Sequence, residues 1–275
     1  MLTSIREAVD VLVVNENSGL ADTENLVALE RSAFAERGAL HVARGAFVDF
    51  ADMRNRAFEQ LKGIEPRPDW VLFIDADEVH GEQIRYIARE LLPRLGADVG
   101  SLDGYTYHFF GTYRWVTDIA RRLMFYRYDP SLRWSGAIHE KLQGLCGRSL
   151  VIPYIYHHYG NVATPRVLAD KYERYHRLGN PVPPREDPES LDIYLEKLNL
   201  VRPYGGAHPA AARETLRTLE AAHAATLAGV DAAYRSGRTP AMRLAATLRG
   251  INERTRVALR RVEHPGLFPG PTVAR

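Results

Sequence analysis

Short apolar runs alternate with longer amphipathic segments over the first two-thirds of the chain. Uninterrupted β-branched and aromatic runs predict strands at Val11–Val14, Ala39–Val42 and Trp70–Ile74. Apolar residues at helical spacing predict helices at Thr23–Arg37, Phe50–Leu61 and Gln83–Leu95. Strands that are apolar throughout and separated by helices are typical of a mostly parallel sheet covered on both faces.

Alternating patterns further along predict additional strands of a mixed sheet. These segments are Tyr105–Tyr113, Arg122–Tyr128 and Leu150–Tyr156, with a tight polar junction at Gly136–Lys141. From about Ala163 the pattern changes to helices with polar loops, and the chain past Tyr204 predicts two or three Ala- and Arg-rich helices. The sequence thus predicts an α/β domain over residues 1–160, its helical and loop completion over 161–204, and a helical C-terminal extension over 205–275.

The composition is that of an ordinary globular protein, with 45% hydrophobic and 25% charged residues. A formal charge of +2 gives no reason to expect a nucleic-acid partner. Cys146 is the one cysteine, so no internal disulfide can form. No apolar run approaches the roughly 20 residues that span a bilayer, and no signal peptide is evident at the N-terminus. We therefore expect a cytoplasmic protein, peripheral to a membrane at most.

Three carboxylates follow the apolar strand at Trp70–Ile74, in the run Asp75-Ala76-Asp77-Glu78. Ligands of open α/β sheets bind beyond the carboxyl ends of the strands, which is where this run lies. Clustered carboxylates repel one another unless a cation neutralises them, and oxygen ligands suit Mg²⁺ or Mn²⁺. An acidic turn that caps the next helix is the alternative, but the preceding buried strand favours a metal site.

Further polar motifs are ambiguous when each is taken alone. The segment Asp49–Phe58 fits the start of an amphipathic helix with Arg54 in solvent, and the His139-Glu140 pair after Gly136 fits a surface ion pair. The same Glu140 could equally serve as a base, and His158 could be a ligand or a structural residue at a strand end.

The order of six segments carries a resemblance to a known family. They are Val9–Asn15, Asp49–Ala57, Trp70–Glu78, Arg122–Phe125, Gly136–Glu140 and His158–Gly160. Over residues 3–178 this order resembles bacterial family 2 glycosyltransferases, and most closely the subgroup that includes lipopolysaccharide-core glucosyltransferases. The resemblance implies the GT-A fold, in which a Rossmann-like nucleotide half and an acceptor half share one mixed sheet flanked by helices.

The resemblance also implies roles for individual residues. On the donor side, Asp75 would face the ribose and diphosphate, and Arg54 would lie near the nucleobase and diphosphate. Asp77 would be the direct ligand of Mn²⁺ or Mg²⁺, with Glu78 and His158 as further metal contacts. Glu140 would be the general base of an inverting single displacement, in which a sugar passes from a nucleotide-sugar donor, by default a UDP-sugar, to an acceptor that the sequence does not identify. Aromatic residues between 105 and 134 are candidates to stack on sugars, although most of them fit an ordinary core better.

Two departures from the family keep other interpretations open. The family begins with a strand and an Asn-Glu loop that form the floor of the nucleotide pocket, and this chain starts at what resembles the following helix. Either about 25 residues, the size of one strand-loop-turn unit, are missing or the floor is built differently. Asn15 stands where the family has a base-contacting Asp, and an amide donates as well as accepts hydrogen bonds.

A catalytically degenerate protein that binds nucleotide or sugar is therefore the alternative function. A metal-dependent nucleotidyl or phosphoryl transferase also needs clustered carboxylates, but it would usually carry a Gly-rich phosphate loop, and the sequence has none.

The C-terminal segment is strongly basic, with nine arginines against two glutamates between Arg235 and Arg275. Its apolar residues fall on one helical face: Leu244, Leu248, Ile251, Thr255, Leu259 and Val262. Such a helix can lie on an anionic membrane. Because the face carries no Trp or Phe anchor, packing against the catalytic domain or a second subunit of a homodimer is the favoured interpretation.

Overall fold

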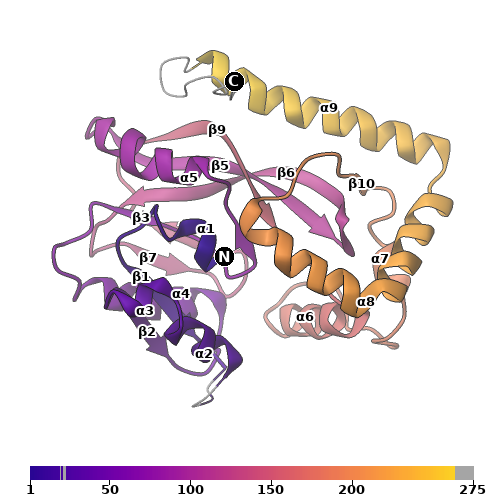
Figure 1. The fold of residues 1–275 in the computed structure, drawn as a ribbon, viewed down its shortest axis with the longest axis horizontal. Helices are drawn as coiled ribbons and strands as arrows, with labels where there is room; N and C mark the ends of the chain where they lie inside the picture. Colours follow the sequence, from indigo (N-terminus) through magenta and orange to yellow (C-terminus); the bar gives the residue numbers. More distant parts are fainter. Residues whose placement is uncertain (19, 21–22, 264–275) are drawn as a thin grey trace.

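The structure is a computed structural model that describes residues 1–18, 20 and 23–263, and its fold is mixed α/β (Figure 1). Its centre is a long antiparallel hairpin of β5 (Val99–Phe110) and β6 (Thr112–Arg127). Gly111 makes the tight turn between them with a φ of +72°, a conformation that favours glycine. The predicted strand Tyr105–Tyr113 is wrong in running across this turn, and the predicted strand Arg122–Tyr128 covers the last part of β6 and one residue beyond it.

Six strands form the larger sheet, in the order β10-β6-β5-β9-β4, with β3 also paired to β6. The remaining members are β3 (Trp70–Leu72), β4 (Glu78–Val79), β9 (Arg148–His158) and β10 (Arg202–Pro203). Only β5 and β9 are parallel neighbours, so the expectation of a mostly parallel sheet is wrong here. The β5–β6 hairpin provides one antiparallel pair, and the others, β3–β6, β4–β9 and β10–β6, bring together strands that are far apart in the sequence.

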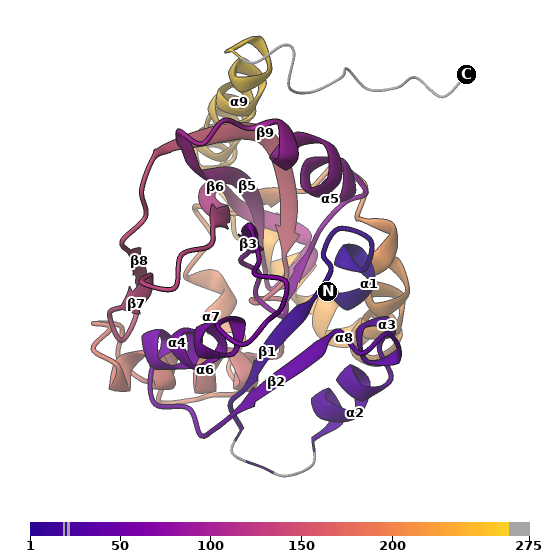
Figure 2. The same cartoon turned by 90° about the vertical axis from the view of Figure 1, so that its left-hand side faces the viewer.

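Two smaller sheets lie beside the larger one. β1 (Leu12–Glu16) and β2 (Leu40–Arg44) form a parallel pair, and β7 (Arg133–Ser135) pairs with β8 (Lys141–Gln143). Figure 2 shows β3 between the larger sheet and the β1–β2 pair. The parallel, helix-connected arrangement that the sequence predicted is therefore confined to the N-terminal part of the chain.

The helices follow the predicted pattern with local breaks. α1 (Leu2–Ile5), α2 (Glu24–Glu30), α3 (Ala33–Glu36) and α4 (Phe50–Leu61) lie in the N-terminal part, and α4 has the predicted bounds. The predicted helix Thr23–Arg37 divides at Ser32, whose hydroxyl caps α3 by accepting from the amide of Ala35.

The predicted helix Gln83–Leu95 is also irregular. It consists of α5 (Gln83–Tyr86), a π-helical stretch over Ile87–Leu91 and a 3₁₀ turn over Leu92–Arg94. Pro93 has no backbone N–H and its ring opposes α-helical hydrogen bonding with the turn before it, which accounts for the change at this end.

Four helices lie in the described part of the second half of the chain. They are α6 (Pro165–Arg177), α7 (Asp192–Leu195), α8 (Ala210–Ser236) and α9 (Pro240–Glu263). One apolar cluster joins Phe110 and Trp115 of the hairpin to Leu168 of α6, Tyr194 of α7 and Tyr234 of α8. Residues 161–204 and α8 therefore share a core with the end of the hairpin.

α9 packs on the sheet through its small residues rather than its large ones. Ala246 and Val257 are buried, whereas Leu244, Leu248, Ile251 and Leu259 are each at least half exposed. The interpretation that the apolar face packs on the catalytic domain is thus wrong for these four residues. Val262 lies in the stretch whose side chains are outside the description.

Within the described residues, no helix has the length and apolar character that crossing a bilayer requires.

Asp231 of α8 links that helix to the hairpin and provides a test of the fold. It is 3% exposed, accepts a hydrogen bond from Trp115 Nε1 at 2.8 Å and pairs with Arg114 Nη1 at 2.5 Å. We expect Asp231→Ala to lower the free energy of unfolding by about 3 kcal/mol in urea denaturation, because it leaves a buried indole N–H without its acceptor. The matched control Asp170→Ala removes an exposed ion pair with Arg166. It should change the free energy of unfolding by less than about 0.5 kcal/mol. Equal effects would contradict this role.

Candidate functional site

The acidic run forms a closed elbow between β3 and β4. The amide of Asp75 donates to Glu78 Oε2 at 3.0 Å, and the amide of Glu78 donates to the carbonyl of Asp75 at 3.0 Å. Glu78 is 1% exposed, and burial together with the charge of Asp75 raises its pKa to about 7. Glu78 therefore lies behind the elbow and fixes its shape, while the carboxylates of Asp75 and Asp77 face the open side.

Arg54 of α4 joins the elbow to the loop that carries Glu140. Its Nη1 lies 3.1 Å from Asp75 Oδ1, and its Nε pairs with Glu140 Oε1. The guanidinium also lies over the ring of Phe73, 4.2 Å from its centroid, and near Trp134. Fixed between two rings and two carboxylates, Arg54 brings two acids from distant parts of the sequence to one point.

The loop from β7 to β8 holds Glu140 in a defined position. Asn55 of α4 donates to the carbonyl of Trp134 at 2.9 Å and accepts from its amide at 2.8 Å. His139 has a φ of +55°, a left-handed conformation that is unfavourable for a non-glycine residue. Such strain directly before Glu140 persists because α4 fixes the start of the loop.

Asp77 and His158 form a second pair at the elbow. Asp77 Oδ1 lies 3.2 Å from His158 Nε2, at the end of β9, where β4 and β9 pair. Burial would raise the pKa of Asp77, but the hydrogen bond and charge of His158, together with Lys171, hold that pKa below its usual value. Asp77 is thus an ionised carboxylate with a neighbouring imidazole nitrogen.

Gly160 makes room for this pair. A Cβ at residue 160 would lie 2.2 Å from Asp77 Oδ2 and 2.9 Å from His158 Nε2. Real Cβ atoms do not approach so closely, so any side chain here would displace one of the two groups. The close approach of Asp77 therefore requires glycine at residue 160.

Three cationic or aromatic residues complete the site and were missed from the sequence. Arg122 Nη2 of β6 lies 3.6 Å from Asp75 Oδ2. Lys171 Nζ of α6 donates to the carbonyl of Gly160 at 3.0 Å, and burial lowers its pKa while Asp77 and Asp75 oppose that shift. Tyr175 lies one turn after Lys171. Burial raises its pKa, and the negative charges of Asp75, Asp77 and Glu140 raise it further. The i, i+4 spacing of Lys171 and Tyr175 was the available signal, because such residues share one helical face.

Asn15 lies at the carboxyl end of β1, where it lines the same cavity as Arg54 and Asp75. Both polar atoms of its side-chain amide are buried, and neither has a hydrogen-bond partner among the described residues. A buried amide that can donate and accept but does neither is suited to a ligand with both kinds of group.

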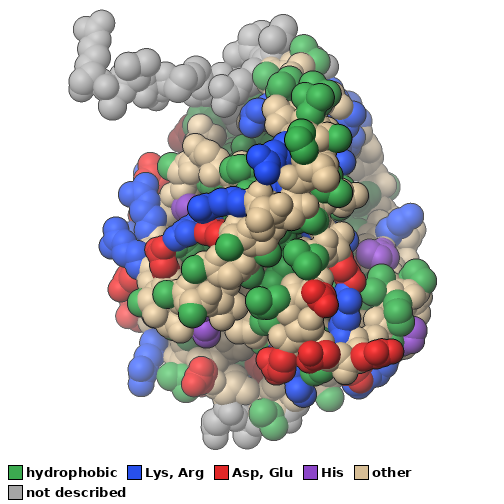
Figure 3. Space-filling view, turned by 90° about the vertical axis from the view of Figure 1, so that its right-hand side faces the viewer, with side chains coloured by type: hydrophobic (Ala, Val, Ile, Leu, Met, Phe, Trp, Pro, Cys, Tyr) green, Lys and Arg blue, Asp and Glu red, His purple; other side chains and the backbone are tan. Residues whose placement is uncertain are grey.

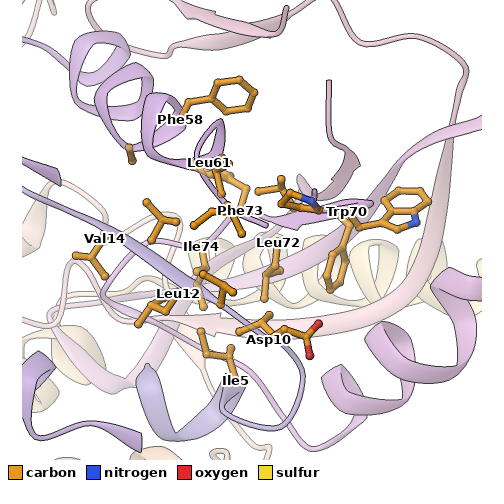
Figure 4. Close-up of a pocket in the computed structure, with 18 of the residues that line it drawn as sticks. Ile5, Asp10, Leu12, Val14, Phe58, Leu61, Trp70, Leu72, Phe73 and Ile74 are labelled. Atoms are coloured by element: carbon orange, nitrogen blue, oxygen red, sulfur yellow. The ribbon is translucent and has the colours of Figure 1, made fainter. Parts of the chain in front are cut away.

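The cavity beside the site has a volume of about 1190 Å³. Figure 4 shows its lining, with Leu12 and Val14 of β1 on one side and Leu72, Phe73 and Ile74 on the other. Asn15, Arg54 and Asp75 line it beside many apolar residues, and charged residues such as Arg67, Asp69 and Arg127 also line it. The site therefore shares residues with a larger cavity whose lining is partly apolar and partly polar.

The side chains at the elbow supply only part of the ligands that a divalent metal ion needs. Among residues 1–18, 20 and 23–263, no group of three or more His, Cys, Asp or Glu side chains is placed to hold a metal. Asp77 and His158 supply two ligand atoms on the open side, while Asp75 is neutralised by Arg54 and Arg122. Mg²⁺ and Mn²⁺ usually keep waters and share phosphate oxygens with a substrate. The arrangement thus suits an ion that arrives with a diphosphate.

The aromatic residues proposed for sugar stacking are mostly core residues. Phe109, Trp115, Trp134 and Tyr105 are buried, and Phe109 lies in a stack with His157 and Tyr159. Tyr175 of α6 lies against Phe50, and burial together with the charges of Asp75, Asp77 and Glu140 raises its pKa.

Neither protein-family models nor curated proteins give a match to this chain.

Gly160 offers a test of the Asp77–His158 pair that alters neither residue. We expect Gly160→Ala to weaken Mn²⁺ binding in the presence of uridine diphosphate by at least tenfold, because the new methyl group displaces the carboxylate. Isothermal calorimetry would measure the Mn²⁺ affinity of both proteins, and circular dichroism would check that the variant folds. Gly205→Ala, where a Cβ meets nothing within 4 Å, is the matched control. Unchanged Mn²⁺ affinity in a folded Gly160→Ala protein would contradict the assignment.

Proposed function

We propose that this chain is a metal-dependent glycosyltransferase of the GT-A type that transfers a sugar from a nucleotide-sugar donor, by default a UDP-sugar, to an acceptor. The observation that carries the proposal is the position of Arg54, which contacts Asp75 of the elbow and Glu140 of a separate loop. The resemblance of six ordered segments to family 2 glycosyltransferases supports it. Inversion by a single displacement is part of the proposal and comes from that resemblance.

Four residues would bind the nucleotide-sugar donor. The unpartnered amide of Asn15 suits the nucleobase, and Asp75 suits the hydroxyls of the ribose. Arg54 and Arg122 supply positive charge within 4 Å of Asp75, which is also where a diphosphate would lie. Arginine is well suited to this task because its fork of donors matches phosphate oxygens.

Asp77 and His158 would hold Mn²⁺ or Mg²⁺ together with the diphosphate. When bound, the ion acts as a Lewis acid that stabilises negative charge developing on the leaving diphosphate. Glu78 serves this arrangement indirectly, since its side chain keeps the elbow closed from behind.

Glu140 is the proposed general base. An acceptor hydroxyl attacks the anomeric carbon, its proton passes to Glu140, and the bond from that carbon to the diphosphate oxygen breaks. When Glu140 takes up the proton it loses the charge that pairs with Arg54. The guanidinium charge is then available to the diphosphate as that group becomes more negative.

A catalytically degenerate binding protein is the competing function. The observation that favours it is the ion pair itself, because the Arg54 guanidinium occupies one of the two carboxylate oxygens of Glu140 and competes there with an acceptor proton. The two functions differ in turnover and not in donor binding.

A donor screen that follows nucleoside diphosphate release in Mn²⁺ separates these cases. We expect Glu140→Gln to lower the transfer rate by about a hundredfold or more without weakening donor binding, because the amide cannot accept the proton. Asp77→Asn should lose transfer and also weaken metal-assisted donor binding. Glu173→Gln, a matched change in an exposed ion pair of α6, should keep full activity.

Full sugar transfer by the Glu140→Gln variant would show that Glu140 is not the base. Full activity in excess chelator would show that the reaction needs no metal ion. Tight Mn²⁺-dependent donor binding by the wild type without transfer or donor hydrolysis would favour the binding protein.

A further inference from the structure

The outer face of α9 is apolar and exposed. Leu244, Leu248, Ile251 and Leu259 are 61%, 57%, 50% and 54% exposed, and their helical spacing places them on one side of α9, opposite the residues that it buries. We call these four residues the α9 stripe. Figures 1 and 2 both place α9 at an edge of the molecule. In Figure 3, hydrophobic and basic side chains gather at the top of the molecule, where Figure 1 places α9.

The opposite side of α9 is held against the sheet by close packing and an ion pair. A Cβ at Gly250 would lie 2.7 Å from Arg202 Nε, so the backbone of α9 lies against this arginine with no room for a side chain between them. Glu253 pairs with the same arginine and accepts a hydrogen bond from the amide of Ile119 at 3.2 Å. Because α9 cannot turn the stripe inward without breaking these contacts, the fold itself holds the stripe outward.

Arginines border the α9 stripe on both sides. With 3.6 residues per turn, Arg249 and Arg256 follow one border, and Arg243 and Arg254 follow the other. Among the described side chains, Arg249, Arg254 and Arg256 have no carboxylate partner, whereas Arg243 donates to backbone carbonyls at the end of α8. Between the borders, up to residue 260, α9 carries only uncharged side chains. The outer side of this stretch therefore combines an apolar centre with positive edges.

This charge pattern favours a lipid surface over a second copy of the chain. In a symmetric dimer the same patch meets itself, so the arginine borders of two α9 helices would lie together without described carboxylates to pair with them. Like charges placed together in this way oppose association. An anionic bilayer instead offers an apolar interface to the stripe and phosphates to the arginines, which is how basic amphipathic helices bind membranes.

We propose that α9 lies along the surface of an anionic lipid bilayer, with the α9 stripe in the interface and the bordering arginines on lipid phosphates. From Leu244 to Leu259 the stripe covers roughly 22 Å of the helix axis, so its side chains enter the interface along one line. The stripe has no Trp or Phe anchor, which makes the contribution of the arginines necessary. Binding should therefore weaken as salt is added.

Co-sedimentation with vesicles tests the stripe. We expect the wild-type chain to bind vesicles of equal parts phosphatidylcholine and phosphatidylglycerol, and not vesicles of phosphatidylcholine alone. The double variant Leu248→Ser, Ile251→Ser should bind the mixed vesicles more weakly by about tenfold or more, because less apolar surface enters the interface. The control Leu191→Ser, Leu195→Ser removes two exposed leucines from another region and should bind as the wild type does.

A second double variant tests the arginines separately. We expect Arg254→Gln, Arg256→Gln to weaken binding to the mixed vesicles by about tenfold or more at low salt, and to reduce the effect of added salt, because fewer charges contact lipid. The control Arg166→Gln, Arg177→Gln changes two exposed arginines of α6 and should keep wild-type binding. All the altered side chains are exposed, so circular dichroism should be the same for each variant and the wild type.

An environment-sensitive fluorophore identifies the face that enters the bilayer. It is attached through Thr255→Cys, on the side of the stripe, in a chain whose exposed Cys146 is replaced by serine. Its emission should rise when mixed vesicles are added, because the label leaves water. The same label attached through Thr218→Cys, at an exposed position of α8, should not respond.

The proposal is overturned if the wild type does not bind the mixed vesicles, if the Leu248→Ser, Ile251→Ser variant binds them as well as its control does, or if the label at residue 255 does not respond. A wild-type dimer in light scattering that the same leucine and isoleucine changes abolish would assign the stripe to a second copy instead. Because no donor or metal is present in these experiments, their outcome is independent of the glycosyltransferase proposal.

Discussion

The ion pairs of Arg54 hold together the parts on which the proposed chemistry depends. Its guanidinium contacts Asp75 at the end of β3 and Glu140 on the β7–β8 loop, and the ring of Phe73 fixes its plane. Three separate segments, a helix, an elbow and a loop, meet at this one cation. The largely buried setting makes these interactions stronger than the same pairs would be in water, and it also makes the loss of any one partner costly.

Around this centre, structural and chemical roles are divided among similar residues. Glu78 is buried and closes the elbow, whereas Asp77, next to it in sequence, faces outward with His158. Asn55 anchors the loop of Glu140, while its neighbour Arg54 contacts the acid itself. Adjacent side chains point in different directions, both at the elbow and around helix α4, so one of each pair supports the fold and the other faces the open side of the site.

The molecule has a feature that its proposed chemistry does not use. Leu244, Leu248, Ile251 and Leu259 lie exposed on the outer face of the C-terminal helix α9. Apolar side chains gathered on one exposed face are more easily explained by an occupant than by isolation.

Local pattern was sufficient for the elements and for the acidic elbow. The apolar run before Asp75 predicted a strand ending in carboxylates, and β3 is that strand, although its residues are partly buried rather than fully buried. The bounds of α4 followed from its apolar spacing, and Asp49 caps its start. These features depend on residues close in sequence, where strand and helix periodicities act.

Tertiary structure decided which side chains meet. The hairpin of β5 and β6 brings Arg122 to Asp75, and α6 brings Lys171 to the elbow, and no local pattern places either residue beside these carboxylates. The sequence showed an apolar face on α9, but the small residues Ala246 and Gly250 allow the opposite face to approach the sheet and leave the leucines outside. Ion pairs and packing faces depend on segments far apart in the chain, so only the assembled fold determines them.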